Sequence, residues 1–314
     1  MTLALDSLLF LLGISFLWYG GNTVVDGAAG IARRFHISEL IIGLTLVSIG
    51  TSLPEVVVNI IASINKESDI VLGNIIGSNI SNTTLILGSV GVLGSLSIPQ
   101  CRLRREINFY VITLFIFLFC IFSPSTHSIP FWQGTLLMVV FFMAAYMFFI
   151  PKESDIAPTT SIKPSPLLKN ILIFTGGCVL LPMGGHFLVK SSISIASTLG
   201  LSKSFISLFA VALGTSLPEL ATSIIAAKKG NTSLAIGNII GSNIFNITLV
   251  LGLSSMISTI SFSPILSTDA LILCLSTIPF VFYLWFSSSA LFSKTLSYGY
   301  LCFYCLYTIY IYVR

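Results

Sequence analysis

Two copies of one hexapeptide hold the residues of this sequence that are best suited to chemistry. Gly-Thr-Ser-Leu-Pro-Glu occupies positions 50–55 and again positions 214–219, each time in the middle of a long apolar stretch. Proline has no backbone N–H and interrupts the hydrogen-bond ladder of a helix, so each copy predicts a kinked helix with freed carbonyls. A carboxylate in such surroundings is costly unless something neutralises it. Glu55 and Glu219 are therefore predicted to form a binding site.

Polar side chains accompany each carboxylate at helical spacing. Residues spaced i, i+3, i+4 and i+7 lie on one face of a helix. The residues with this spacing are Ser48, Thr51, Ser52 and Glu55 in the first copy and Ala212, Thr215, Ser216 and Glu219 in the second. The next apolar segments carry polar residues at i, i+4 and i+8, namely Asn74, Ser78 and Asn82 in one and Asn238, Ser242 and Asn246 in the other.

These side chains predict the kind of ion that would bind. Hard oxygen atoms suit Ca²⁺, Na⁺ or Mg²⁺, whereas the lack of His and Cys in the four stripes argues against zinc, copper or iron. No intramembrane Lys or Arg is expected beside the two glutamates, so a cation or protons must neutralise them. Two carboxylates balance one Ca²⁺, two Na⁺ or two H⁺. That charge balance favours a site at which cations compete and exchange.

The composition places the chain in a membrane. Of its 314 residues, 55% are hydrophobic and only 8% are charged, which excludes a soluble globular domain. The net charge of +4 belongs to the loops and gives no indication of nucleic-acid binding. We predict an all-α integral membrane protein with ten transmembrane helices. The ten segments cover approximately residues 4–34, 38–64, 69–92, 106–123, 129–150, 167–199, 203–227, 232–258, 267–287 and 294–312.

The two halves of the chain align at a constant offset of 164 residues. The offset superimposes Glu55 on Glu219, and residues 74–80 on residues 238–244. The domains predicted from it are a first five-helix repeat (1–150, core 43–88), a linker (151–166) and a second five-helix repeat (167–314, core 207–252). An odd number of helices per repeat forces the second copy to enter the membrane from the opposite side. Inverted repeats of this kind are typical of transporters, whose site lies where the repeats meet.

Glycine pairs and loop charges extend this prediction. Gly20-Gly21 and Gly184-Gly185 mark equivalent places in the long first and sixth segments, which are expected to be tilted or bent. In the predicted topology, eleven basic residues lie on one side of the membrane and four lie on the other. The richer side holds Arg33, Arg34, Arg102, Arg104, Arg105, Lys152, Lys163, Lys169, Lys228, Lys229 and Lys294, and the other side holds Lys66, Lys190, Lys203 and Arg314. The richer side is predicted to be cytoplasmic, which leaves both termini outside a plasma (inner) membrane.

The repeated blocks resemble those of a known family. Gly-Thr-Ser-Leu-Pro-Glu, followed by Gly-Asn-Ile-Ile-Gly-Ser-Asn-Ile-x-Asn, is similar to the alpha repeats of the calcium/cation antiporter superfamily. That superfamily includes the sodium/calcium exchangers and their bacterial calcium/sodium:proton antiporter relatives. The resemblance covers essentially the whole chain. It implies ten helices, four of which surround a diamond-shaped cation site, and a first and sixth helix that slide against the other eight.

The resemblance also implies roles for individual residues. Glu55 and Glu219 would share Ca²⁺, with carbonyls of Thr51 and Thr215 completing that site. The flanking Na⁺ sites would use Ser52, Ser78, Ser216 and Ser242, with the carbonyls of Ser48 and Ala212. Asn82 and Asn246 would line the middle of the cavity. Several family members have Asp where this chain has Asn246, and in the potassium-dependent branch that Asp is linked to K⁺ use, so K⁺ dependence is not expected.

We therefore predict a secondary active antiporter that exchanges Ca²⁺ for Na⁺ by alternating access. The neutral hydroxyls favour Na⁺, because a proton needs only the carboxylate, but a Ca²⁺/H⁺ antiporter using the same two glutamates is the alternative. A cation channel, an intramembrane hydrolase and an anion importer fit less well. The channel would require an open path, the hydrolase would require a nucleophile with its base, and the anion importer would require a basic residue at the midplane. The expected partners are Ca²⁺, Na⁺ and/or H⁺ and the lipid bilayer, with no cofactor, enzymatic activity, nucleic acid or soluble protein partner.

Three features outside the repeated blocks carry weaker expectations. Asp26 precedes Arg33 and Arg34 by two turns and is expected to pair with one of them. His186 is expected to pack between helices. The Phe- and Tyr-rich fourth, fifth, ninth and tenth segments are interpreted as lipid-facing scaffold.

Overall fold

The computed structural model describes residues 3–93, 100–123, 127–149, 166–198, 214–286 and 292–313. Almost all of the described chain is helical, and the label η marks a π-helical turn. In order, the elements are α1 (Leu3–Phe35), α2 (Glu39–Ile42), η1 (Gly43–Val47), α3 (Ser48–Thr51), α4 (Leu53–Ile64), α5 (Ser68–Ser81), η2 (Asn82–Ile86), α6 (Leu87–Leu93), α7 (Gln100–Phe122), α8 (Phe131–Phe149), α9 (Leu167–Thr198), α11 (Leu217–Lys228), α12 (Thr232–Phe245), η4 (Asn246–Val250), α13 (Leu251–Ile257), α14 (Pro264–Phe286) and α15 (Lys294–Val313).

The predicted segments correspond to these helices. Within the described residues, eight helices are long and apolar enough to cross a membrane, and the bent pair Glu39–Thr51 and Leu53–Ile64 adds a ninth. Of the seventh predicted segment, 203–227, the structure describes only the part from residue 214 onward, which contains α11. Helix α7 begins at Gln100 instead of 106 because its first turns contain Arg102, Arg104 and Arg105, which a search for apolar runs leaves out.

The 164-residue offset holds for the helix bounds as well as for the sequence. Helices α4 and α11, Leu53–Ile64 and Leu217–Lys228, are related by it at both ends. The same is true of α5 and α12, of η2 and η4, and of α6 and α13. Equivalent sequences have therefore adopted equivalent local structures, down to the single π-helical turns.

Each hexapeptide breaks its helix as predicted. The axis bends by 46° between α3 and α4. At the break, Ser52 has φ −87° and ψ 7°, and its equivalent Ser216 has φ −83° and ψ 0°. Pro54 and Pro218 follow in the first turn of the next helix, where the missing N–H leaves no donor unmatched.

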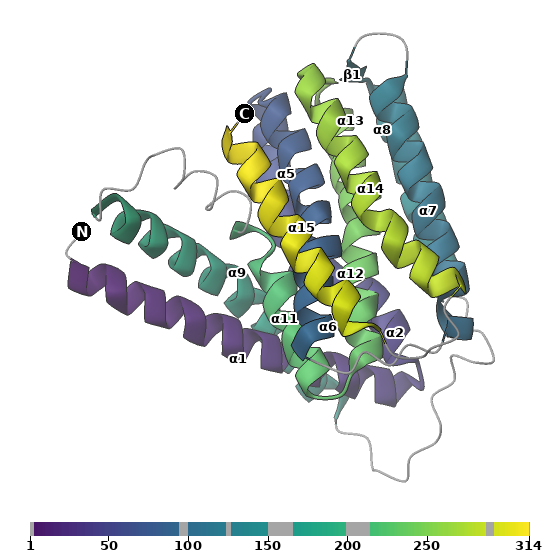
Figure 1. The fold of residues 1–314 in the computed structure, drawn as a ribbon. Coiled ribbons are helices and arrows are strands. Elements are labelled where there is room, and N and C mark those ends of the chain that lie inside the picture. Colours follow the sequence, from purple (N-terminus) through teal and green to yellow (C-terminus); the bar gives the residue numbers. More distant parts are fainter. Residues whose placement is uncertain are drawn as a thin grey trace.

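The long helices α1 and α9 lie side by side, antiparallel, and lean away from the rest of the bundle (Figure 1). Glycines bring their backbones together. A Cβ on Gly13 would lie 2.9 Å from the Gly184 carbonyl, and one on Gly27 would lie 2.7 Å from the Phe174 nitrogen. Such distances leave no room for a side chain, and small residues are what allow close helix contact in membranes. Gly20 and Gly184 were predicted to matter, whereas Gly13 and Gly27 were not.

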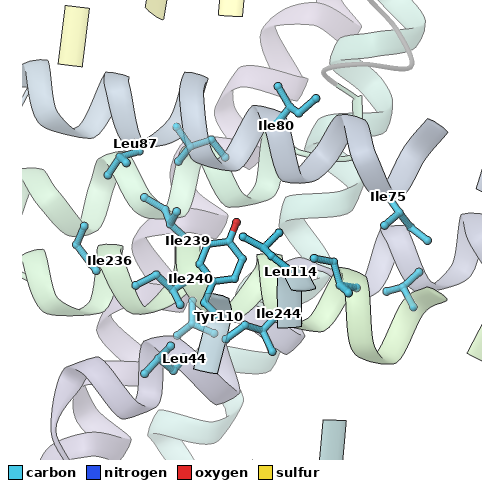
Figure 2. Packing of buried hydrophobic residues seen from close by; sticks show 14 of the residues in the cluster. Leu44, Ile75, Ile80, Leu87, Tyr110, Leu114, Ile236, Ile239, Ile240 and Ile244 are labelled. Atoms are coloured by element: carbon cyan, nitrogen blue, oxygen red, sulfur yellow. The ribbon is translucent and has the colours of Figure 1, made fainter. Parts of the chain in front are cut away.

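Isoleucine, leucine and aromatic side chains fill the space between the central helices (Figure 2). Tyr110 and Phe117 of α7 are fully buried, and Phe280 of α14 is 1% exposed. The fourth and ninth segments are therefore part of the core and are not simply lipid-facing, which corrects that expectation. Aromatic composition alone cannot distinguish a core-facing helix from a lipid-facing one, because lipid is as apolar as the protein interior.

A short two-stranded sheet was also not predicted. Strand β1 (Ser128–Ile129) pairs antiparallel with β2 (Ile260–Ser261), Ile129 opposite Ile260. The pair joins the segment after α7 to the segment after α13. Strands of two residues are too short to leave a periodic pattern in the sequence.

Candidate cation-binding site

Glu55 and Glu219 lie in the first turns of α4 and α11, directly after the two helix breaks. Each is 1% exposed. The N-terminal end of a helix favours negative charge, so the break places each carboxylate at a favourable helix end. Even so, both oxygens of Glu55 and Oε2 of Glu219 accept no hydrogen bond from a described residue. Buried charge without a partner is strongly destabilising, and a bound cation or a proton would relieve it.

Two equivalent hydrogen bonds join the repeats across the site. Thr51 Oγ1 donates to Asn238 Oδ1 at 3.2 Å, and Thr215 Oγ1 donates to Asn74 Oδ1 at the same distance. The offset relates Thr51 to Thr215 and Asn74 to Asn238, so each bond is the counterpart of the other. The polar stripes of the broken helices and of α5 and α12 thus meet at one place, with contributions from both halves.

The serines of the site are not used equally in the two halves. Ser52 Oγ donates to Glu219 Oε1 at 2.9 Å, and Ser78 Oγ lies 3.4 Å from Thr215 Oγ1. The hydroxyls of Ser216 and Ser242 have no hydrogen-bond partner among the described residues. One carboxylate therefore accepts a hydroxyl from the opposite repeat while the equivalent carboxylate does not.

Asn82 and Asn246 are the first residues of the π-helical turns η2 and η4. Both are 1% exposed, and neither side-chain amide has a partner in the described part of the chain. π-helical turns occur often at functional sites, because the wider turn disturbs the regular backbone ladder. The sequence predicted the two asparagines but not the turns, for which no compositional signal is known.

Of the two equivalent residues Ser48 and Ala212, the structure describes only Ser48. Ser48 Oγ donates to the carbonyl of Leu44 at 2.8 Å, within the helix that precedes the break. The Ser48 carbonyl, an expected Na⁺ ligand, accepts from the Ser52 nitrogen at 3.0 Å. Its counterpart Ala212 lies outside the described residues.

Glycines let α12 approach the continuous segment of α2, η1 and α3 closely beside the site. A Cβ on Gly237 would lie 2.5 Å from the Leu40 carbonyl, and one on Gly241 would lie 2.6 Å from Ser48 Oγ. For Gly73 and Gly77, the equivalents in α5, no described atom lies within 4 Å of such a Cβ. The segment equivalent to η1 would fall at 207–211, outside the described residues.

The donor set of the site is made of oxygen. It combines two carboxylates with serine and threonine hydroxyls and asparagine amides, all of them buried or nearly so. Among the described residues, no three His, Cys, Asp or Glu side chains gather into a group that could hold a metal. Hard cations such as Ca²⁺ and Na⁺ fit a set of this composition, and two carboxylates are enough to neutralise one Ca²⁺.

Asp26 does not pair with Arg33 or Arg34. Its Oδ1 accepts a hydrogen bond from Lys229 Nζ at 2.6 Å, which ties α1 to the end of α11. Lys228 Nζ lies 5.7 Å from the ring centroid of Trp18 in the same interface. The expected partners were close in sequence, and the actual one is 203 residues away. His186 is exposed, and the ring 6.1 Å from its own, between centroids, belongs to its chain neighbour Phe187, so the expectation that it packs between helices is wrong.

Comparisons with known proteins identify the family of this chain. The family profile described as sodium/calcium exchanger protein matches residues 6–150 and 169–313. The inner membrane protein YrbG of Escherichia coli is 32% identical over 294 residues, covering 90% of this chain and 89% of the relative. The sodium/calcium exchanger MaX1 of Methanosarcina acetivorans is 32% identical over 297 residues, covering 82% and 85%. Among solved structures, the sodium–calcium exchanger NCX_Mj superimposes with a TM-score of 0.83 at 26% identity, covering 97% of this chain and 98% of that one.

Proposed function

The chain belongs to the sodium/calcium exchanger family, and we propose that it is a secondary active antiporter that exchanges Ca²⁺ for Na⁺ by alternating access. The members of this family are membrane transporters of cations. The observation that carries the proposal is the pair of buried glutamates, three of whose four carboxylate oxygens have no partner among the described residues. Such oxygens are available to the transported ion.

Ca²⁺ would bind between Glu55 and Glu219. Both side chains are held at helix breaks, and the bonds from Thr51 to Asn238 and from Thr215 to Asn74 fix the two repeats relative to each other. Because the carboxylates come from different halves, the ion bridges the repeats. A site left empty would expose two unpaired charges to the protein interior, so release of one cation is coupled to binding of another.

Na⁺ is proposed as the counter-ion because neutral oxygens surround the carboxylates. The hydroxyls of Ser216 and Ser242 and the amides of Asn82 and Asn246 are buried and have no hydrogen-bond partner in the described part of the chain. Na⁺ carries one charge and needs several neutral ligands, whereas a proton needs only a carboxylate oxygen. Exchange of H⁺ for Ca²⁺ is the alternative, and both oxygens of Glu55 would be free to accept a proton. Three Na⁺ for one Ca²⁺ would move net charge and respond to the membrane potential.

Alternating access would come from α1 and α9 moving as a pair. Their glycine contacts hold them to each other along much of their length, as at Gly13 with Gly184 and Gly20 with Leu181. Ten transmembrane helices in two inverted repeats, with the pair sliding over the remaining eight, complete the proposed architecture.

Purified protein in liposomes would distinguish the two counter-ions. An Na⁺ gradient and a pH gradient are imposed separately, and Ca²⁺ uptake is followed in each. We expect uptake to follow the Na⁺ gradient and to be increased by a membrane potential of the appropriate sign. Uptake that ignored Na⁺ and followed the pH gradient would replace the proposal with Ca²⁺/H⁺ antiport, and no uptake under either gradient would remove antiport altogether.

The orientation follows from the loop charges, eleven basic residues on one side and four on the other. We propose that the linker 151–166 is cytoplasmic and that both termini lie outside the plasma (inner) membrane. Single cysteines at position 160 and at position 3, placed in a cysteine-free background, can be labelled in intact cells with an impermeant reagent. Position 3 should react and position 160 should not, and the opposite pattern would reverse the topology.

A further inference from the structure

A second group of buried polar side chains lies outside the set of predicted cation ligands. Asn243 of α12, Thr83 of η2, Tyr110 of α7 and Thr277 of α14 are each at most 1% exposed. Figure 2 shows the Tyr110 ring among Ile239, Ile240 and Ile244, with its hydroxyl the only oxygen on a labelled side chain. Polar groups in such surroundings are costly unless they bond to one another.

The four side chains form one continuous series of contacts, called here the relay. Asn243 Nδ2 donates to Thr83 Oγ1 at 3.1 Å. Thr83 Oγ1 and Thr277 Oγ1 each lie 3.5 Å from the Tyr110 hydroxyl oxygen, at the outer limit of a hydrogen bond. Thr277 Oγ1 in turn donates to the Leu273 carbonyl at 2.9 Å.

The two ends of the relay, the Asn243 amide nitrogen and the Leu273 carbonyl, fix the direction of every hydrogen bond in it. An amide nitrogen can only donate and a carbonyl can only accept, whereas each hydroxyl has one proton to donate. Thr83 therefore accepts from Asn243 and donates to Tyr110. Tyr110 donates to Thr277, whose own proton goes to Leu273. Each of the three hydroxyls both donates and accepts. Tyr110 is the link between α14 and the pair formed by Asn243 and Thr83.

This relay exists on one side of the molecule only. At the offset positions, Thr83 is matched by Ile247 and Tyr110 by Cys274, which cannot reproduce it. The equivalent of Asn243 is Asn79, which bonds within its own helix to the Ile75 carbonyl at 2.7 Å. Likewise Thr113, the equivalent of Thr277, donates to the Phe109 carbonyl at 2.9 Å.

The Asn243–Thr83 end of the relay adjoins both Asn82 and Asn246 in sequence. Thr83 directly follows Asn82 in the π-helical turn η2, and Asn243 precedes Asn246 by three residues, on the last turn before η4. We propose that Tyr110 is a positioning residue, which through Thr83 and Asn243 ties these two turns to α7 and α14 and so sets the separation of the two asparagine amides. The inference rests on the proposed function, because it gives those amides a role in binding Na⁺.

Na⁺ and Ca²⁺ should respond differently to loss of the relay. The carboxylates that would hold Ca²⁺ lie on α4 and α11, which contribute no side chain to the relay. The asparagine amides are neutral ligands, on which Na⁺ depends more than Ca²⁺. A change that merely loosened the fold would weaken both ions together, whereas a change in amide position would alter their ratio.

The test measures equilibrium binding of Na⁺ and of Ca²⁺ to the purified full-length protein by calorimetric titration. Tyr110→Phe and Thr277→Val break the relay. Thr113→Val is the matched control, because among the described residues its hydroxyl bonds only within α7. We expect both relay variants to weaken Na⁺ binding on the order of five-fold, the factor that a lost net hydrogen bond gives. Ca²⁺ binding should change much less, and Thr113→Val should bind both ions as the wild type does.

Four outcomes decide the matter. An altered ratio of Na⁺ to Ca²⁺ affinity in both relay variants supports the positioning role. Unchanged affinities, or equal weakening of both ions, would overturn it while leaving the proposed function intact. If Tyr110→Phe does not fold, Thr277→Val answers the same question and leaves residue 110 unchanged. If the wild-type protein binds neither ion, the proposed function and the role of Tyr110 both fall.

Discussion

Glu55 combines full burial with two carboxylate oxygens that accept no hydrogen bond from the described residues. Glu219 occupies the equivalent position but accepts a hydroxyl from Ser52 at 2.9 Å. The repeated hexapeptide led to the prediction of both carboxylates and the threonines beside them as site residues. It could not predict this difference, because Ser52 and Ser216 stand in the same hexapeptide.

The first prediction concerns the serine hydroxyls. Replacing Ser78 and Ser242 together by Ala removes two neutral oxygens and leaves both carboxylates in place. We expect the Na⁺ concentration for half-maximal Ca²⁺ exchange to rise on the order of ten-fold, since each polar contact contributes about 1 kcal/mol. Half-saturation by Ca²⁺ should change far less.

The control for this variant is Thr135→Val, which removes an exposed hydroxyl of α8 whose one bond to a described residue goes to the Phe131 carbonyl. Equal loss of Na⁺ and Ca²⁺ affinity in the serine variant would contradict a specific role in Na⁺ binding.

At the scale of elements, the sequence predicted what depends on apolar length and on proline. Helix α9 was expected over 167–199 and spans Leu167–Thr198. The break at Ser52 follows from Pro54, which removes a donor from the ladder. The π-helical turns η2 and η4 were missed because an extra residue in one turn changes neither composition nor hydrophobicity. The pairing of β1 with β2 was missed because each strand has only two residues.

The second prediction concerns the contact between α1 and α9. A Cβ on Gly184 would lie 2.8 Å from the Leu17 nitrogen and 2.9 Å from the Gly13 carbonyl, so neither neighbour can yield without backbone movement. Gly184→Leu should force the helices apart and lower the free energy of unfolding by about 1–3 kcal/mol, as overpacking does. Thermal unfolding and Ca²⁺ flux of the reconstituted protein check this.

Gly176 provides the control on the same helix, because it is exposed and no described atom lies within 4 Å of the position of its Cβ. Gly176→Leu should leave both unfolding and flux near wild type. A Gly184→Leu variant that behaved like the control would mean that the close contact does not hold the pair together.

For the whole molecule, the offset of 164 residues predicted more of the structure than any single motif did. It relates equivalent sequences, equivalent helix bounds and the two hydrogen bonds from Thr51 and Thr215. It did not predict the contacts that differ between the halves. The ion pair of Asp26 with Lys229 has no counterpart, because the equivalent positions hold Lys190 and Asn65, which cannot form one. Such contacts depend on how two distant segments meet, and a repeat in one sequence carries no information about that.

The most direct measurement is Ca²⁺ uptake driven by an Na⁺ gradient in liposomes containing wild-type protein, Glu55→Gln, Glu219→Gln or the double variant. Glutamine keeps the size of each side chain and removes its charge, so folding should be preserved, which thermal unfolding in detergent would verify. With two carboxylates as the ion ligands, we predict uptake by the wild type and none above the empty-liposome level by any folded variant. Robust Na⁺-driven Ca²⁺ uptake by the folded double glutamine variant would contradict the assignment of the site.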